Sequence, residues 1–136
     1  MPIPEGFHTV TPYLVVQGAV EAIALYEQAF GAERGLIETT PEGRLRHGQI
    51  RIGDSHLMLC DGSPDYPFMP SIQQFGGSPV HLFLYVEDAD AVFRRARTAG
   101  MEELMPMADQ TYGRSGGVRD RFGLIWWITT APERCA

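Results

Sequence analysis

The sequence contains no lysine and no asparagine. Its eleven basic residues are all arginines, and seventeen acidic residues bring the net charge to −6. Without lysine, the chain has no lysine side chain to form a Schiff base or to act as nucleophile or general base. The acidic balance also argues against a protein that binds nucleic acid through the phosphate backbone. The forked arginine side chain remains, and it suits carboxylate or phosphate groups on a small ligand.

Cysteine and long apolar stretches are also scarce. The chain has only Cys60 and Cys135 and no CxxC pair, so we expect two free thiols and no ribbon-type zinc site. No apolar run reaches the roughly 18 residues of a membrane helix, and the first residues lack the features of a signal peptide. We therefore expect a cytoplasmic protein without a membrane partner.

An internal repeat dominates the 136 residues. Residues 11–19 (TPYLVVQGA) and 81–89 (HLFLYVEDA) share a pattern of alternating apolar side chains followed by a short polar break. A helical pattern follows each segment, over residues 19–30 and 88–99, and a glycine ends it, Gly31 or Gly100. The chain thus states one strand–helix pattern twice, seventy residues apart.

Three further strands are predicted in each half, bounded by Gly-, Pro- and Asp-containing turns. Their ranges are 33–40, 44–52 and 56–60 in the first half, and 102–107, 112–119 and 124–129 in the second. These strands predict an α+β fold of two βαβββ modules, residues 7–61 and 79–131, joined by a linker over residues 62–78. The linker is rich in Gly, Pro and Ser, but its apolar residues predict that part of it packs down or covers a cavity.

The doubled order of elements resembles the vicinal-oxygen-chelate superfamily, which includes glyoxalase I, bleomycin-resistance proteins and extradiol dioxygenases. The resemblance covers nearly all of residues 7–131. It is carried by TPYLVVQGA at 11–19, AFGA at 29–32, HGQIRIGDSHLML at 47–59 and VRDRFG at 118–123. More closely, the chain is similar to the glyoxalase-like subgroup labelled as demethylubiquinone-methyltransferase-like or phosphonate-operon proteins.

The resemblance implies that each mixed sheet curves into a half-barrel, with a helix on the convex face and a ligand site on the concave face. Strand alternation then sorts the side chains between the two faces. Ile50 and Ile52 should face the helix. The residues expected to bind a ligand on the concave side are Tyr13, His47, Gln49, Arg51, Met58, His81, Phe83 and Trp127, with Tyr85 beside them.

The polar members of this set predict an anchor for the ligand. We expect Arg51, Gln49, His47 and His81 to converge on one side of the cavity, opposite Tyr13 and Trp127. An arginine in such a place must find a carboxylate or a ligand oxygen, because it cannot deprotonate. Two roles for Arg51 remain open: it binds an acid or phenolate group of the ligand, or it forms an internal salt bridge, for example to Glu38.

The resemblance also implies four positions for metal ligands, one on the first and one on the fourth strand of each half. Here they are Thr11, Met58, His81 and Trp127, and only His81 is a competent ligand for a divalent ion. We therefore expect no retained metal and no other cofactor. The alternative is a displaced site, built from His47 and His81 with an acid among Glu38, Glu42, Asp61 and Asp120.

These considerations favour a protein that binds a small, partly aromatic molecule without chemistry, as in the bleomycin-resistance branch. The alternative is a metal-dependent lyase, isomerase or dioxygenase that uses a displaced site. Whether the protein is an enzyme stays open, and no catalytic residues are identified. We also expect a homodimer, since members of the superfamily often build their sites across one and the apolar linker residues Phe68, Met69 and Phe75 would suit an interface.

Overall fold

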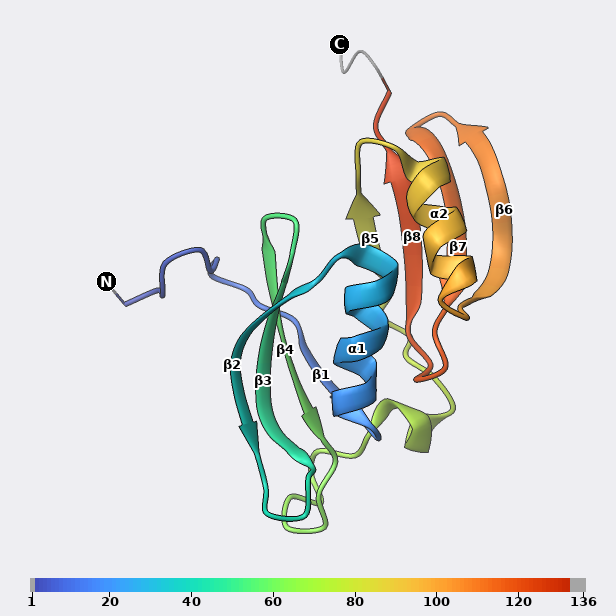
Figure 1. The fold of residues 1–136 in the computed structure, drawn as a ribbon. Helices are drawn as coiled ribbons and strands as arrows, with labels where there is room; N and C mark the ends of the chain where they lie inside the picture. The colour runs from blue at the N-terminus through green and yellow to red at the C-terminus, as the bar shows by residue number, and fades with distance from the viewer. Residues whose placement is uncertain (1, 133–136) are drawn as a thin grey trace. The chain divides into compact units, whose positions relative to one another are not determined.

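Each half of the chain folds into a four-stranded sheet with one helix across one face (Figure 1). The structure is a computed structural model that describes residues 2–132. The first unit holds β1 (Tyr13–Val16), α1 (Ala19–Phe30), β2 (Glu33–Thr39), β3 (Leu45–Ile52), β4 (Ser55–Asp61) and the 3₁₀ helix η1 (Ile72–Phe75). The second holds β5 (Leu82–Tyr85), α2 (Ala89–Thr98), β6 (Glu102–Gln110), β7 (Gly113–Arg119) and β8 (Ile125–Thr130).

The two sheets have the same topology. The strand orders are β1-β4-β3-β2 and β5-β8-β7-β6, with the first strand parallel to the last and the other pairs antiparallel. Tyr13 pairs with Met58 in one sheet, and Phe83 pairs with Trp127 in the other. The predicted α+β fold of two βαβββ modules is therefore confirmed, and the two sheets are separate rather than closed into one barrel.

Alternation along the strands places one face of each sheet against its helix. On β3, Ile50 and Ile52 are buried, as predicted. The residues that alternate with them, Gln49 and Arg51, are only half-buried. The core of the first unit combines these residues with one stripe of α1, which includes Ile23 and Tyr26. The second core is built in the same way, and its largest fully buried side chains include Trp126, Met101, Ile128 and Val118.

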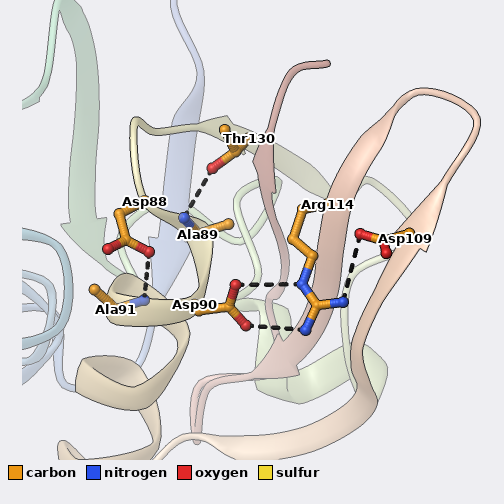
Figure 2. Close-up of polar contacts among 7 residues, drawn as sticks. All are labelled: Asp88, Ala89, Asp90, Ala91, Asp109, Arg114 and Thr130. Carbon is orange, nitrogen blue, oxygen red and sulfur yellow. Dashed lines mark hydrogen bonds and ion pairs between the residues drawn. The ribbon is translucent and has the colours of Figure 1, made fainter. Parts of the chain in front are cut away.

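The helices differ in how their first turns are capped. α1 begins after Gly18, whose φ of 87° is left-handed and which has no side chain to cap the helix. Asp61, at the end of β4, accepts hydrogen bonds from the Gly18 and Ala19 N–H groups at 2.7 and 3.0 Å. In the second unit Asp88 caps α2 itself, and Thr130 at the end of β8 accepts from the Ala89 N–H at 2.8 Å (Figure 2). The last strand of each unit thus completes the start of its helix.

The structure differs from the sequence prediction at the ends of some strands and in the linker. β1 and β5 are shorter than expected and begin at Tyr13 and Leu82, whereas β6 continues to Gln110 rather than Met107. Part of the predicted linker is structured as η1, which is fixed by two reciprocal hydrogen bonds between Gln17 and Gln73 at 2.9 and 2.8 Å. The chain divides between Gly76 and Gly77, within the predicted linker.

No helix among residues 2–132 is long and apolar enough to span a membrane. Cys60 is a free, buried cysteine, and Cys135 lies outside the described residues.

Candidate functional site

The open face of the first sheet, opposite α1, carries a chain of hydrogen-bonded polar side chains. His47 lies between Tyr13 and Gln49. Its Nδ1 is 3.5 Å from the Tyr13 hydroxyl oxygen, and its Nε2 is 3.2 Å from the Gln49 amide nitrogen. The two ring nitrogens of His47 thus connect Tyr13 on one side with Gln49 on the other, and the tautomer of His47 sets which atom donates in each contact. The Tyr13 hydroxyl in turn forms a hydrogen bond to the Cys60 thiol. Gln49, His47, Tyr13 and Cys60 therefore form one continuous row of polar contacts.

The two groups at the end of this row, the Tyr13 hydroxyl and the Cys60 thiol, are both uncharged at physiological pH. Partial burial, reinforced by the hydrogen bond to Cys60, raises the pKa of Tyr13 to about 12. Burial likewise raises the pKa of the Cys60 thiol, and the nearby Asp61 carboxylate adds to that rise. A thiol with a raised pKa is a poor nucleophile, so Cys60 is unsuited to nucleophilic catalysis.

A cavity of about 520 Å³ opens at the end of this sheet, where β4 runs into residues 62–69. Tyr13 and Cys60 form its inner wall. The other walls come from the β2–β3 turn, the start of β3 and the segment after β4, and they include Arg44, Arg46, Tyr66 and Met69. The cavity thus combines two aromatic rings and a thioether with two guanidinium groups. We call it the first cavity.

The structure brings together some of the residues of the first unit that were predicted to bind a ligand. Tyr13, His47, Gln49 and Met58 share the open face, but only Tyr13 lines the first cavity. Tyr13 lies beside His47 and bonds to it, so the expectation that it stands opposite the polar group was wrong.

Arg51 is held by the protein itself. Its guanidinium donates to the Glu33 carboxylate and to the Gly53 carbonyl. Glu33 is its direct neighbour across the β2–β3 ladder, whereas Glu38, named above as an example of a partner, lies opposite His47. The contacts therefore favour the internal salt bridge over the ligand anchor, with Glu33 as the partner.

The open face of the second sheet is aromatic. The Phe83 ring lies 5.1 Å from Tyr85 and 5.9 Å from Tyr112, centre to centre. The Trp127 indole N–H donates to the His81 Nδ1 at 3.0 Å, so these two residues are also neighbours rather than opposites. His81, Phe83, Tyr85 and Trp127 thus share one face, as strand alternation predicted.

Comparison with known proteins connects this architecture to a family. Residues 6–128 match the Glyoxalase/Bleomycin resistance protein/Dioxygenase superfamily. The chain belongs to this superfamily. An uncharacterised protein of Mycobacterium bovis is 40% identical over 121 residues, which cover 86% of this chain and 79% of that protein.

Solved structures show the same glyoxalase-like fold. A gene product from Arabidopsis thaliana superposes with a TM-score of 0.74 at 25% identity, covering 93% of this chain and 99% of that one. TnmS3, an antibiotic binding protein from Streptomyces sp. CB03234, superposes with a TM-score of 0.71 at 22% identity, covering 97% of this chain and 99% of that one.

The metal positions of glyoxalase-like enzymes do not fit a divalent ion in this chain. The Thr11 hydroxyl donates to the His8 carbonyl at 3.5 Å, and Met58 offers only a soft thioether. The His81 Nδ1 already accepts from Trp127, whose indole N–H has no lone pair to give. Within residues 2–132, no three His, Cys, Asp or Glu side chains come together as a metal-binding group.

Two of the acids considered for a displaced site have structural partners. Asp61 accepts from the backbone N–H groups of Gly18, Ala19 and Leu45. Asp120 is buried and accepts from the Phe122 and Leu124 N–H groups and from the Trp126 indole at 2.9 to 3.1 Å. Both carboxylates therefore hold the superfamily fold together in this chain.

Sequence reasoning missed Arg44, Arg46 and Tyr66 as cavity residues, whereas Met69 belongs to the apolar linker residues expected to pack down or cover a cavity. Strict alternation back from Ile50 places Arg46 under the helix, where an arginine without a partner would be costly. That conflict was the available signal that the ladder is irregular near Arg46. Tyr66 gave no comparable signal, because it belongs to an irregular segment without periodicity.

Proposed function

We propose that this glyoxalase-superfamily protein binds a small, partly aromatic molecule in the first cavity and needs no metal to do so. The observation that carries the proposal is the cavity itself. Its volume of about 520 Å³ lies within the range of small-molecule sites. Tyr13, Tyr66 and Met69 offer apolar contact area, and polar groups stand between them.

The chemistry of the walls supports binding rather than catalysis. A catalytic base or nucleophile needs a pKa matched to its task, near neutrality. The pKa values of Tyr13 and Cys60 are both raised, so both groups stay protonated and neutral. Groups of this kind orient a ligand by hydrogen bonds without taking a proton from it.

The superfamily offers a precedent for such a role. TnmS3, which shares the fold, is described as an antibiotic binding protein. The competing function is a metal-dependent lyase, isomerase or dioxygenase that uses a displaced site. The donor sets described above do not favour it, because the side chains at the usual ligand positions are unsuited to a divalent ion.

The test combines two measurements on the purified protein. Native mass spectrometry and elemental analysis report what co-purifies, and thermal-shift titration with a panel of mono- and bicyclic aromatic compounds reports binding. We expect stabilisation by some of these compounds, lost in Tyr66→Leu. Phe75→Leu is the matched control, because Phe75 is 71% exposed on η1 and does not line the first cavity.

Two results would overturn the proposal. Near-stoichiometric zinc, nickel, iron or manganese would favour the metal-dependent alternative. Stabilisation that is equal in Tyr66→Leu and Phe75→Leu would move the binding site away from the first cavity.

A further inference from the structure

Resting on the proposed function, we infer that the ligand of the first cavity is an acid: Arg46, assisted by Arg44, binds a carboxylate on a small aromatic molecule. The inference depends on where the chain places these two guanidinium groups and on which carboxylates the fold provides for them.

A β-bulge turns Arg46 out of the helix-facing row. Thr39 pairs with Leu45 and Glu38 pairs with His47, so Arg46 is the additional residue on β3. Leu45 takes the buried place instead: it is 1% exposed, and its side chain lies beside Gly48 on the helix side. Bulges of this kind re-aim a side chain and are frequent next to functional sites. Here the result is an exposed arginine on the wall of a cavity.

The second unit has an arginine at the corresponding sequence position, in a stretch of the ladder that has no bulge. Gly48 pairs with Leu59, and Gly116 pairs with Ile128 at the matching position. Arg46 and Arg114 stand two residues before these glycines and therefore correspond in the sequence repeat, but Arg114 stays on the helix side, the place that Leu45 takes in the first unit. Their surroundings therefore differ.

Arg114 is neutralised inside its own unit. Two of its nitrogens donate to the two oxygens of Asp90 at 3.2 Å, and a third approaches Asp109 at 3.5 Å (Figure 2). The hydrogen bonds to Asp90 raise the pKa of Arg114, as expected for a cation that gains an anionic partner.

Arg46 lacks the equivalent partner. Asp90 is the second residue of α2, and the second residue of α1 is Val20, which has no charge to offer. In the described part of the chain, Arg46 forms no ion pair, and Arg44 approaches only Glu42, at 4.0 Å across the turn. The first unit thus keeps the arginine of the repeat but not the carboxylate that neutralises it.

The acids near the first cavity do not replace that carboxylate. Both oxygens of Asp61 are engaged by backbone N–H groups, at 2.7 to 3.0 Å. Asp65 is exposed on the rim and forms no ion pair with either arginine within residues 2–132. The guanidinium of Arg46 is therefore available to an anion that comes from outside the chain.

The rest of the cavity wall defines the class of ligand. A guanidinium keeps its charge at any physiological pH, and its planar fork matches the two oxygens of a carboxylate. Tyr66 and Met69 line the same cavity and offer surfaces against which an aromatic ring can pack. A ring with an acid group attached satisfies both features, whereas a neutral ring would leave Arg46 without a partner.

The experiment uses three probes of nearly equal shape: 6-fluoro-2-naphthoate, the corresponding carboxamide and the corresponding aminomethyl compound. Fluorine NMR titration of the whole chain gives the affinity of each. We expect the acid to bind at least tenfold more tightly than the amide, the amine to bind most weakly, and added salt to weaken only the acid.

Variants locate the effect. Arg46→Gln should weaken binding of the acid about tenfold, the loss expected when a charge-assisted bond disappears, and should leave the amide within about twofold. Arg44→Gln should have a smaller effect of the same kind. Arg94→Gln is the matched control, because Arg94 lies exposed on α2, outside the first cavity, and its loss changes the net charge equally. The probe comparison in the unaltered protein does not depend on any variant folding.

The outcomes separate the inference from the proposed function. Equal binding of acid and amide, or tighter binding of the amine, would overturn the acid specificity and leave an aromatic binding site in place. Equal losses in Arg46→Gln and Arg94→Gln would likewise overturn the role of Arg46. If no aromatic probe of any charge binds, the proposed function fails together with the inference.

Discussion

Removal of the Asp61 carboxylate should destabilise the first unit more than the substitution of any other partly exposed side chain in that unit. Asp61 accepts three backbone hydrogen bonds, from Gly18 at 2.7 Å, Ala19 at 3.0 Å and Leu45 at 2.7 Å. Two of them replace the cap that Gly18 cannot supply, and the third attaches the start of β3 to the end of β4. Asp61→Ala therefore leaves three partly buried N–H groups without their acceptor.

The expected loss is about 3 kcal/mol, at roughly 1 kcal/mol for each hydrogen bond to a charged acceptor that is lost and partly replaced by water. Asp61→Asn keeps one acceptor oxygen and should cost about half as much. Asp65→Ala is the matched control. Asp65 lies four positions further along the same rim, is exposed, and should contribute less than about 0.5 kcal/mol.

Urea unfolding followed by far-ultraviolet circular dichroism measures the change in the free energy of unfolding. Tryptophan fluorescence reports the second unit separately, because both tryptophans, Trp126 and Trp127, lie on β8. A loss below about 1 kcal/mol in Asp61→Ala, or one no larger than in Asp65→Ala, would refute the assignment of Asp61 as the cap of α1.

Other predictions concern ionisation, backbone shape and assembly. The raised pKa of Tyr13, about 12, means that the unfolded chain ionises this tyrosine first, so the stability that Tyr13 contributes is complete below pH 10 and falls between pH 10 and 12. Urea unfolding at pH 9 and 11 in the wild type and in Tyr13→Phe measures that fall, which should be smaller in the variant. In a Cys135→Ser variant, the remaining Cys60 should resist iodoacetamide at pH 8 until urea is added, because burial raises its pKa; rapid alkylation of the folded protein would contradict this. Gly113→Ala should cost well over 2 kcal/mol, because its Cβ would lie 2.2 Å from the Thr130 carbonyl oxygen, whereas Gly43→Ala meets no atom within 4 Å and should cost only about 1 kcal/mol for its left-handed φ. Thermal unfolding of the two variants gives the difference, and equal losses would contradict the reasoning. Light scattering should give about 30 kDa, twice the 15.1 kDa chain, if the protein is a homodimer; a mass near 15 kDa at micromolar concentration would exclude it.

The repeat and the two faces of each sheet could be predicted from the sequence because both follow from local patterns. Alternation is a property of a single strand, and it correctly separated Ile50 and Ile52 from His47 and Gln49. The seventy-residue offset likewise needs no knowledge of tertiary contacts.

The partners of the arginines could not be predicted in this way, because they depend on the register between strands. A register shift between Arg34 and Ile37 places Glu33 opposite Arg51 and moves Glu38 to His47. A second shift releases Arg46 from the helix-facing row. Each register shift depends on contacts among two strands and a helix, so it cannot be predicted from any single segment of the sequence.

The capping of each helix by the last strand of its own unit has a consequence for synthesis on the ribosome. Asp61 reaches back 43 residues to Gly18, and Thr130 reaches back 41 residues to Ala89. Neither helix start can be completed until the chain of that unit has emerged to its final strand. Such long-range closure favours assembly in whole-unit steps over gradual growth. The first unit can complete its fold while the second is still being translated. The internal repeat therefore corresponds to a whole folding unit, which includes the last strand that caps its own helix.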